Sequence, residues 1–317
     1  MDVQELIHGF SHSSTNIHAN MTIKPRHIEH PGPCTEAAVE TLASRCQTVK
    51  ETLHSGQTLI AAFTALLRKY QVSGAVARLG QGVVFPAKYV LPALSSDPAY
   101  AVYYSEVHTA CAPLRVTDGA VTIGLKDQQP WLHCHARWLD NKEVLHCGHW
   151  LPDQTVLEDD LPIELTLLLD ATFETCPDEH THFSLFKPRV TRWTALDMTD
   201  PPSDLPNVEM VNGYLVRVAP NIDFGEALLA ACAQHDLSKA KVLGGVGSVV
   251  GAAFEDGRTV EPFVTELLVK SGYIDLDKQQ TTLDISLIDY TGVVTEGRLA
   301  QGRNPVLVTC ELVLVEA

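Results

Sequence analysis

Two stretches of the chain follow the same order, and together they decide the fold. Residues 55–67 read Ser-Gly-Gln-Thr-Leu-Ile-Ala-Ala-Phe-Thr-Ala-Leu-Leu, in which apolar side chains recur at helical spacing after a small polar cap. A strand-like run with internal glycines follows over residues 73–84. Residues 221–231, Asn-Ile-Asp-Phe-Gly-Glu-Ala-Leu-Leu-Ala-Ala, again predict a capped helix, and residues 238–250 again predict a strand interrupted by glycines. The chain therefore contains a helix followed by a glycine-interrupted strand twice.

Later segments of the two halves also correspond in order. The matching pairs are residues 131–138 with 283–290, Gly148-His149 with Gly297-Arg298, and residues 156–169 with 306–315. Each half therefore predicts one main helix packed on several strands. We expect an α+β fold made of two similar halves, in tandem along the chain.

The boundaries of the two copies follow from composition. A chain of 317 residues has room for about two domains. Residues 1–20 are rich in His, Ser and Asn without a hydrophobic period, and predict a flexible extension. A stretch rich in Pro and Asp, which includes Asp-Met-Thr-Asp-Pro-Pro-Ser-Asp-Leu-Pro, predicts a linker over residues 189–212. The two domains are then expected over residues 21–188 and 213–317.

Composition and charge exclude several classes of protein. Hydrophobic residues make up 45% of the chain and charged residues 20%, which is typical of a globular protein rather than a disordered or fibrous one. With 23 Lys and Arg against 39 Asp and Glu, the formal charge of −16 opposes binding to phosphate backbones. The longest apolar runs are far shorter than the ~20 residues of a membrane helix. We therefore expect neither nucleic acid nor a membrane as partner.

Cysteine and glycine patterns add two further expectations. Eight cysteines are scattered without a repeated CxxC, and the opening residues lack the basic and apolar regions of a signal peptide, which together favour a reducing cytoplasm. The run Gly244-Gly245-Val246-Gly247 lacks the lysine and the following helix of a phosphate-binding loop. It predicts a bulge or a tight turn instead.

Three histidines carry the chemistry of the first half. His133 and His135 are two residues apart, which on a strand directs both imidazoles to one face and Cys134 to the other. A short turn would return the chain antiparallel and bring His149 beside them. Three neutral imidazoles with an open fourth position are typical of a catalytic or ligand-binding zinc site. The chain contains 14 histidines, so a patch of hydrogen-bonded histidines without metal is the second interpretation of these residues.

The same residues carry a resemblance to a known family. His133-Cys134-His135, Gly148-His149 and the pair Leu151-Pro152 before a long apolar strand resemble the plants-and-prokaryotes-conserved domain, abbreviated PCC or PPC. The resemblance implies a curved antiparallel sheet and assembly as trimers. It also implies a zinc ion on the three histidines near a subunit boundary. We accordingly expect a homo-oligomer with a trimer-like arrangement of domains, and Zn²⁺ or another divalent metal as cofactor.

The second half resembles the same domain but lacks its histidines. The likeness lies in the leading helix, the Gly247-Ser248 turn, the segment 266–272 and the closing strand at Glu311. Plant members that bind DNA carry a separate basic Arg-Gly-Arg-Pro motif that is missing from this sequence, so DNA binding is not carried over. Only the first half is expected to hold metal, because the positions of its three histidines are taken in the second half by Asp284, Ser286 and Arg298.

Further residues are candidates for catalysis and substrate binding. Glu106 lies where the family usually shows a strand carboxylate, matching Glu266 in the other half, and is a candidate general base or alternatively a structural carboxylate. Arg137 shares a strand face with the histidines and is a candidate for catalysis and for binding a substrate carboxylate. Arg26 and His30 are further candidates for substrate binding.

Two functions are compatible with these residues. The first is a metal-dependent enzyme of the hydrolase or lyase type that acts on a small carboxylated metabolite, since a zinc ion with an open position activates water or a carbonyl group. The second half would then serve as scaffold or lend residues such as Glu266 or Arg298 across an interface. The alternative is a non-catalytic regulatory or assembly protein in which the metal is structural.

Overall fold

The computed structural model describes most of the chain, over residues 26–34, 37–191 and 209–317. The predicted extension over residues 1–20 and most of the predicted linker lie outside the described residues. The ends of that predicted linker are strand, because residues 189–190 close β13 and residues 211–212 open β14.

The described part of the first half contains one helix and a series of strands. The helix is α1 (Leu59–Tyr70). The strands are β1 (Val39–Leu53), β2 (Gly74–Leu79), β3 (Gly82–Val84), β4 (Lys88–Val90), β5 (Pro92–Leu94), β6 (Val102–Tyr104), β7 (His108–Thr109), β8 (Leu114–Lys126), β9 (Gln129–Leu139), β10 (Leu145–Trp150), β11 (Leu161–Leu168), β12 (Ala171–Pro177) and β13 (Ser184–Val190).

The described part of the second half also contains one helix. The helix is α2 (Phe224–Gln234). The strands are β14 (Val211–Val218), β15 (Lys239–Val249), β16 (Ala252–Ala253), β17 (Thr259–Val260), β18 (Thr265–Asp275), β19 (Gln280–Asp289), β20 (Val294–Arg298) and β21 (Val306–Glu316).

The two halves repeat one strand order. In the first half the pairing runs β1-β11-β2-β8-β9-β10, and all of these pairs are antiparallel. In the second half it runs β14-β21-β15-β18-β19-β20, again antiparallel throughout. Along the chain, α1 lies between β1 and β2, and α2 lies between β14 and β15. The predicted α+β fold, with one main helix on an antiparallel sheet in each half, is confirmed.

Both helices begin a few residues later than the periodicity alone predicts. The side chain of Thr58 accepts a hydrogen bond from the backbone N–H of Ala61 and caps α1. The side chain of Asp223 does the same for α2 through the backbone N–H of Glu226. The residues before each cap are therefore turn rather than helix.

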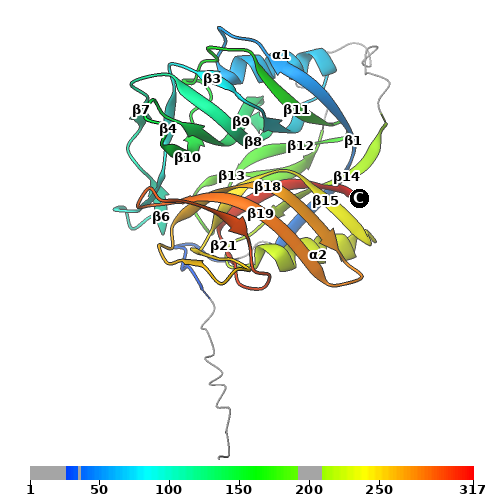
Figure 1. Ribbon diagram of the computed structural model, residues 1–317. Coiled ribbons are helices and arrows are strands. Elements are labelled where there is room, and N and C mark those ends of the chain that lie inside the picture. The colour runs from blue at the N-terminus through cyan, green and yellow to red at the C-terminus, as the bar shows by residue number, and fades with distance from the viewer. Residues whose placement is uncertain (1–25, 35–36, 192–208) are drawn as a thin grey trace, which may run out of the picture.

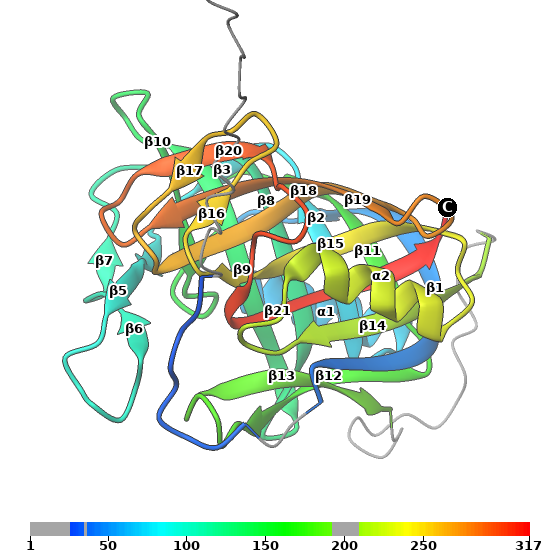
Figure 2. The same cartoon turned by 90° about the horizontal axis from the view of Figure 1, so that it is seen from below.

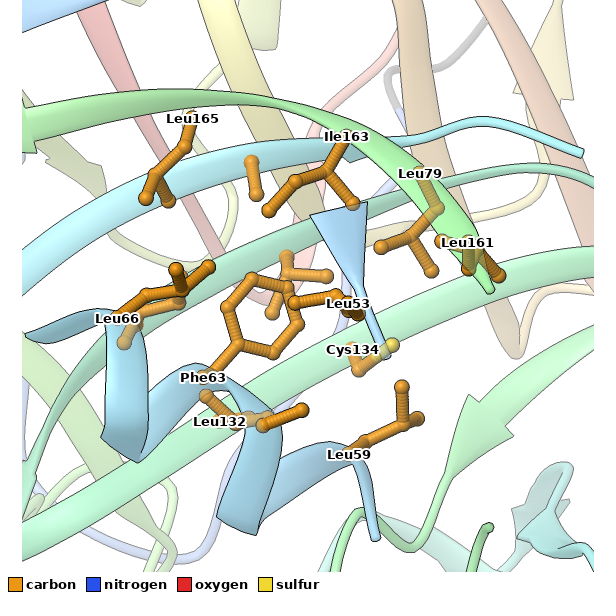
Figure 3. Close-up of a cluster of buried hydrophobic side chains, with 14 of the residues drawn as sticks. Leu53, Leu59, Phe63, Leu66, Leu79, Leu132, Cys134, Leu161, Ile163 and Leu165 are labelled. Carbon is orange, nitrogen blue, oxygen red and sulfur yellow. The ribbon is translucent and has the colours of Figure 1, made fainter. Parts of the chain in front are cut away.

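The core of the first half lies between α1 and one face of the sheet. Figure 3 shows Phe63 of α1 directed toward leucine and isoleucine side chains of the sheet, with Cys134 of β9 among them. Cys134 is fully buried, as alternation along the strand predicts. The other labelled members of this cluster are Leu53, Leu59, Leu66, Leu79, Leu132, Leu161, Ile163 and Leu165.

Strand β1 joins the two halves into one sheet. Its first part, residues 39–46, pairs with β14, and its second part, residues 46–53, pairs with β11. Figure 1 shows α1 and α2 on opposite outer sides of the molecule, with the strands of the two halves between them. Seen from below, α2 lies across the outer face of the second half (Figure 2). The inner faces of the two halves therefore contact each other, as β8 and β9 do with β18.

A bulge interrupts β15 where the sequence predicts one. The register between β15 and β21 shifts between Leu243 and Val246. Gly244 and Gly245 occupy this bulge with φ angles of +68° and +107°, a region that side chains rarely adopt. The glycine run is therefore a strand irregularity, as predicted, and not a phosphate-binding loop.

No helix within the described residues is long and apolar enough to span a bilayer.

Gly245→Ala should destabilise the protein more than Gly257→Ala, because an added Cβ is crowded at residue 245 and meets no neighbour at residue 257. A Cβ at residue 245 would lie 2.7 Å from Cγ2 of Val269, whereas a Cβ at Gly257, where φ is +88°, meets nothing within 4 Å. We expect Gly245→Ala to lower the free energy of unfolding by about 2–4 kcal/mol, from backbone strain plus overpacking. Gly257→Ala should lose about 1–2 kcal/mol from backbone strain alone. Urea unfolding followed by circular dichroism measures both, and equal losses would contradict this account of the bulge.

Candidate metal centre

The three predicted histidines come together on two adjacent strands. His133 and His135 lie on β9, and His149 on β10 stands opposite His135 in the antiparallel register. One ring nitrogen from each lies within 4.8 Å of the others. Cys134 faces the core on the other side of β9, so the triad faces the second half of the molecule. Among the described residues this is the one group of three His, Cys, Asp or Glu side chains close enough to hold a metal ion.

Hydrogen bonds fix the protonation of two of these rings. Nδ1 of His133 lies 2.7 Å from Oε2 of Glu311, and Nδ1 of His135 lies 2.7 Å from the backbone oxygen of Leu267. An ionised carboxylate and a backbone carbonyl only accept hydrogen bonds, so each Nδ1 carries a proton and donates it. In the neutral form of each ring, the Nε2 atom then has a free lone pair.

The Nε2 atoms of His133 and His135 are 3.1 Å apart. In the neutral form of both rings with protonated Nδ1 atoms, two lone pairs lie close together at this distance and repel each other. Two nitrogen ligands at about 2.0–2.1 Å from one tetrahedral zinc ion would be about 3.4 Å apart. A divalent metal between them removes the repulsion, and the carboxylate and carbonyl behind each ring are the partners that metal-bound histidines ordinarily have. The residues present therefore fit a metal ion.

Burial keeps two of the three imidazoles, His135 and His149, neutral. His135 is 1% exposed, and burial, together with the nearby His133 and His149, holds the pKa of His135 well below its usual range. Burial, together with His133, lowers the pKa of His149 to about 3. Neutral imidazole is the form that binds metals. At neutral pH these rings are ready to bind without losing a proton.

The second half supplies the carboxylates around the triad. Glu311 of β21 accepts from His133 and also from the hydroxyl of Thr309, at 3.2 Å. Glu266 of β18 has its Oε1 3.8 Å from Nε2 of His135 and 3.8 Å from Nδ1 of His149. Burial raises the pKa of Glu266 to about 8. Its Oε2 is buried and has no hydrogen-bond partner in the part of the chain that the structure describes, and the same holds for Nδ1 of His149.

A cavity of about 250 Å³ opens over the triad between the two halves. Its walls are largely aromatic and aliphatic, with several hydroxyl groups, and no lysine or arginine lines it among the described residues. The lining includes the three histidines with Glu266 and Glu311, the aromatic residues Tyr103, Tyr104, Trp131, Phe183 and Phe186, and the hydroxyl residues Thr175, Ser184, Ser248, Thr265 and Thr309.

The other predicted site residues do not line this cavity. Glu106 is exposed two residues after the end of β6, and it is not among the residues that line the cavity. Arg137 shares the face of His133, as predicted, but lies farther along β9. There its guanidinium is 3.1 Å from Asp118 and also pairs with Glu296 of the second half. Those two carboxylates hold it away from the cavity.

Arg26 and His30 bind the second half outside the cavity. Nη1 of Arg26 lies 3.3 Å from the backbone oxygen of Val250, and Nη2 lies 3.4 Å from Glu261. Nε2 of His30 lies 2.7 Å from the backbone oxygen of Leu307. In the structure both side chains tie the segment before β1 to the second half.

The counterparts of the triad in the second half form an ion pair. Nε of Arg298 lies 3.0 Å from Asp284, at the exposed side of β19 and β20. Arg298 therefore does not reach the cavity, whereas Glu266 does. Sequence reasoning named Glu266 only as a residue the second half could lend, and it used Glu311 only to mark a strand. Their positions beside the triad depend on how the two halves pack, which no local pattern encodes.

Comparison with known proteins finds a match to a protein family in the second half of the chain. A family model described as the Plants and Prokaryotes Conserved (PCC) domain matches residues 207–317. The second half of the chain is a PCC domain. The first half repeats the strand order of this PCC domain, as described above. No curated protein matches the chain.

Several solved structures resemble part of the chain. A plant- and prokaryote-conserved protein of Pyrococcus horikoshii is 16% identical with a TM-score of 0.38, over 46% of this chain and 94% of its own. A metal-containing protein of Archaeoglobus fulgidus is 16% identical with a TM-score of 0.37, over 50% and 97%. A protein of Ralstonia eutropha, named as a candidate DNA-binding protein, is 13% identical with a TM-score of 0.34, over 44% and 89%.

Glu311→Ala should weaken metal binding although Glu311 is not a ligand. The substitution removes the acceptor that fixes the tautomer of His133 and leaves its Nδ1–H without a partner. We expect affinity to fall by about 10–100-fold, with a smaller loss in Glu311→Gln, which keeps an accepting oxygen. Competition against a chelating dye with Zn²⁺ as probe measures this. Asp275→Asn, which alters a buried carboxylate paired with Lys278 outside the cavity, is the control. Unchanged affinity in Glu311→Ala would refute the role of Glu311.

Metal binding should be unusually resistant to acid. For a histidine of ordinary pKa near 6.5, the fraction of neutral imidazole falls about 10-fold between pH 7.5 and 5.5. Three such histidines would together lower the metal affinity about 1000-fold. His135 and His149, whose pKa values are lowered, do not take up protons in this range. The affinity at pH 5.5 should therefore exceed that of an ordinary triad by about 100-fold. The same competition titration repeated at both pH values tests this, and a 1000-fold loss would contradict it.

Proposed function

We propose that the protein is a metal-dependent enzyme of the hydrolase or lyase type that acts on a small oxygenated metabolite. His133, His135 and His149 would hold Zn²⁺ or another divalent cation. The observation that supports this most directly is the cavity of about 250 Å³ on the open side of the triad. A purely structural zinc site is normally closed by four protein ligands.

A bound cation would supply Lewis acidity, which polarises a carbonyl group or lowers the pKa of water. The chain supplies the rest of the chemistry. Glu311 and the backbone oxygen of Leu267 orient two of the rings. Glu266 lines the cavity, and burial raises its pKa to about 8, so at neutral pH it holds a proton that it can give to a leaving group. A bound cation would favour its ionised form, which can accept a proton from a nucleophile. Glu266 takes the place in this proposal that the sequence suggested for Glu106.

The substrate would have to be recognised without a guanidinium. Neither Arg26 nor Arg137 lines the cavity, so a substrate carboxylate would depend on the cation for its counter-charge. The first half is best explained as a second PCC copy, since its strand order is the same. A homo-oligomer with a trimer-like arrangement of such domains, and the absence of nucleic acid as partner, remain predictions.

The alternative is an assembly or regulatory protein with a structural metal. It is favoured by one observation, the 3.8 Å distance of Glu266 from two of the rings, which lets a small shift make it a fourth ligand. The two functions differ in what Glu266 does. As a base it can be replaced without loss of metal, and as a ligand it cannot.

Elemental analysis, oligomeric mass and a screen of small carboxylates, esters and lactones should separate the two functions. We expect about one metal ion per chain in the wild type, as a single three-histidine site requires. His133→Ala and His149→Ala should lose the metal and keep their mass. Glu266→Gln should keep the metal and lose about 10²–10⁴-fold in turnover of whichever compound the wild type converts.

The control for these variants is His146→Ala. His146 also lies on β10, but its Nε2 is 3.0 Å from Asp140 and it is not part of the triad. It should keep both metal and activity. Loss of metal in Glu266→Gln, or loss of assembly together with metal, would favour the structural alternative. A wild-type protein that contains no metal would refute the proposed metal-dependent enzymatic function.

A further inference from the structure

One wall of the cavity is a continuous aromatic surface that starts at the triad. The ring of Tyr104 meets the ring of His149 at 5.3 Å between centroids in an edge-on arrangement. The ring centroid of Phe183 lies 6.2 Å from that of Tyr104 and 5.8 Å from that of Tyr103. The rings of Phe183 and Tyr103 are stacked, with an interplanar angle of 24°. We call Tyr103, Tyr104 and Phe183 the aromatic wall. It is built from two separate segments, β6 and the turn before β13.

Two rings of the aromatic wall, Tyr103 and Tyr104, are partly exposed to solvent. Tyr103 is 46% exposed and Tyr104 is 38% exposed, although both line the cavity. Large aromatic side chains contribute most when their faces are covered, and here the cavity itself is what lies against them. Trp131 and Phe186 line the same cavity. A flat apolar group in the cavity would cover these faces.

Charge narrows the choice of ligand further. Glu266 and Glu311 line the cavity, and no lysine or arginine does so within the described ranges. A phosphate or a dicarboxylate would bring two or more negative charges next to these carboxylates with only one cation to offset them. A ligand with one oxygen-bearing group for the cation and an apolar remainder meets no such penalty.

The volume of the cavity indicates the size of ligand that it can surround. An apolar cavity of about 150 Å³ accommodates benzene. The cavity of about 250 Å³ therefore has room for one substituted ring.

We propose that the cavity binds a single-ring aromatic compound whose oxygen-bearing substituent reaches the metal while its ring stacks on the aromatic wall. This inference rests on the proposed metal site and names the class of substrate for it. Tyr103, Tyr104 and Phe183 are then the residues that determine specificity.

Two hydroxamates that differ only in the ring provide the test. Benzohydroxamate and acetohydroxamate chelate a metal through the same two oxygens, and only the first carries a phenyl group. In the Zn²⁺-loaded protein we expect benzohydroxamate to bind about 10–100-fold more tightly, because burial of a ring of this size contributes a factor of that order. Isothermal titration calorimetry measures both dissociation constants.

Variants of the aromatic wall should abolish this preference selectively. Tyr103→Leu and Phe183→Leu keep an apolar side chain but remove a ring that stacks on no histidine of the triad, and each should reduce the ratio of the two dissociation constants by about 3–10-fold. Acetohydroxamate affinity and metal content should not change. The control is Tyr290→Leu, since Tyr290 is also partly exposed, at 38%, but does not line the cavity, and its ratio should equal that of the wild type.

The outcomes separate this inference from the proposed function. Equal affinity for the two hydroxamates, or an unchanged ratio in both wall variants, would overturn the aromatic class and leave the open metal site intact. Failure of both hydroxamates to bind a protein that holds its metal would show a closed site, and would overturn the proposed function as well.

Discussion

Strand β1 pairs with β11 along one part of its length and with β14 along the other, and the relative position of the two halves follows from this shared strand. Because the pairing is continuous, the second half cannot turn away from the first without breaking backbone hydrogen bonds. Buried ionic contacts add to the constraint. Arg217 of β14, which is fully buried, donates to Asp178 at 2.8 Å and to Glu40 of β1 at 3.0 Å. Breaking such a buried pair costs several kcal/mol, so the arrangement is rigid.

The fixed arrangement lets two similar halves contribute different chemistry to one site. The first half provides the imidazoles of His133, His135 and His149, and the second half provides Glu266, Glu311 and the backbone oxygen of Leu267. Neither half alone would hold this set. In the second half the equivalent positions form an exposed ion pair between Asp284 and Arg298, which has no role at the cavity. The two halves therefore share one strand order, while the side chains that they present at their boundary differ.

The parts of the site that were predictable are those that depend on local geometry. Alternation along β9 and a short hairpin suffice to bring His149 opposite His135, and the glycine run suffices to predict a bulge. The helix starts were less accurate because a single side chain, Thr58 or Asp223, decides them. Glu106 and Arg137 were chosen by their place along the chain. Their positions in the structure depend instead on the extra strands β4 to β7 and on Asp118 and Glu296 at the boundary of the halves.

Electrostatics explains why Glu266 and Glu311 matter more to the site than Glu106, the carboxylate that the sequence suggested. The chain carries a net charge of −16, yet the two acidic groups nearest the triad are buried and are not balanced by lysine or arginine in the cavity wall. Glu311 is satisfied by His133 and Thr309, whereas Glu266 has a buried oxygen without a partner. Burial raises the pKa of Glu266 to about 8, and a divalent cation held by the three histidines would favour its ionised form. A cation of charge +2 beside two carboxylates leaves the site close to neutral. Such a site favours a ligand with little charge of its own, held by its oxygen atoms and its apolar surface.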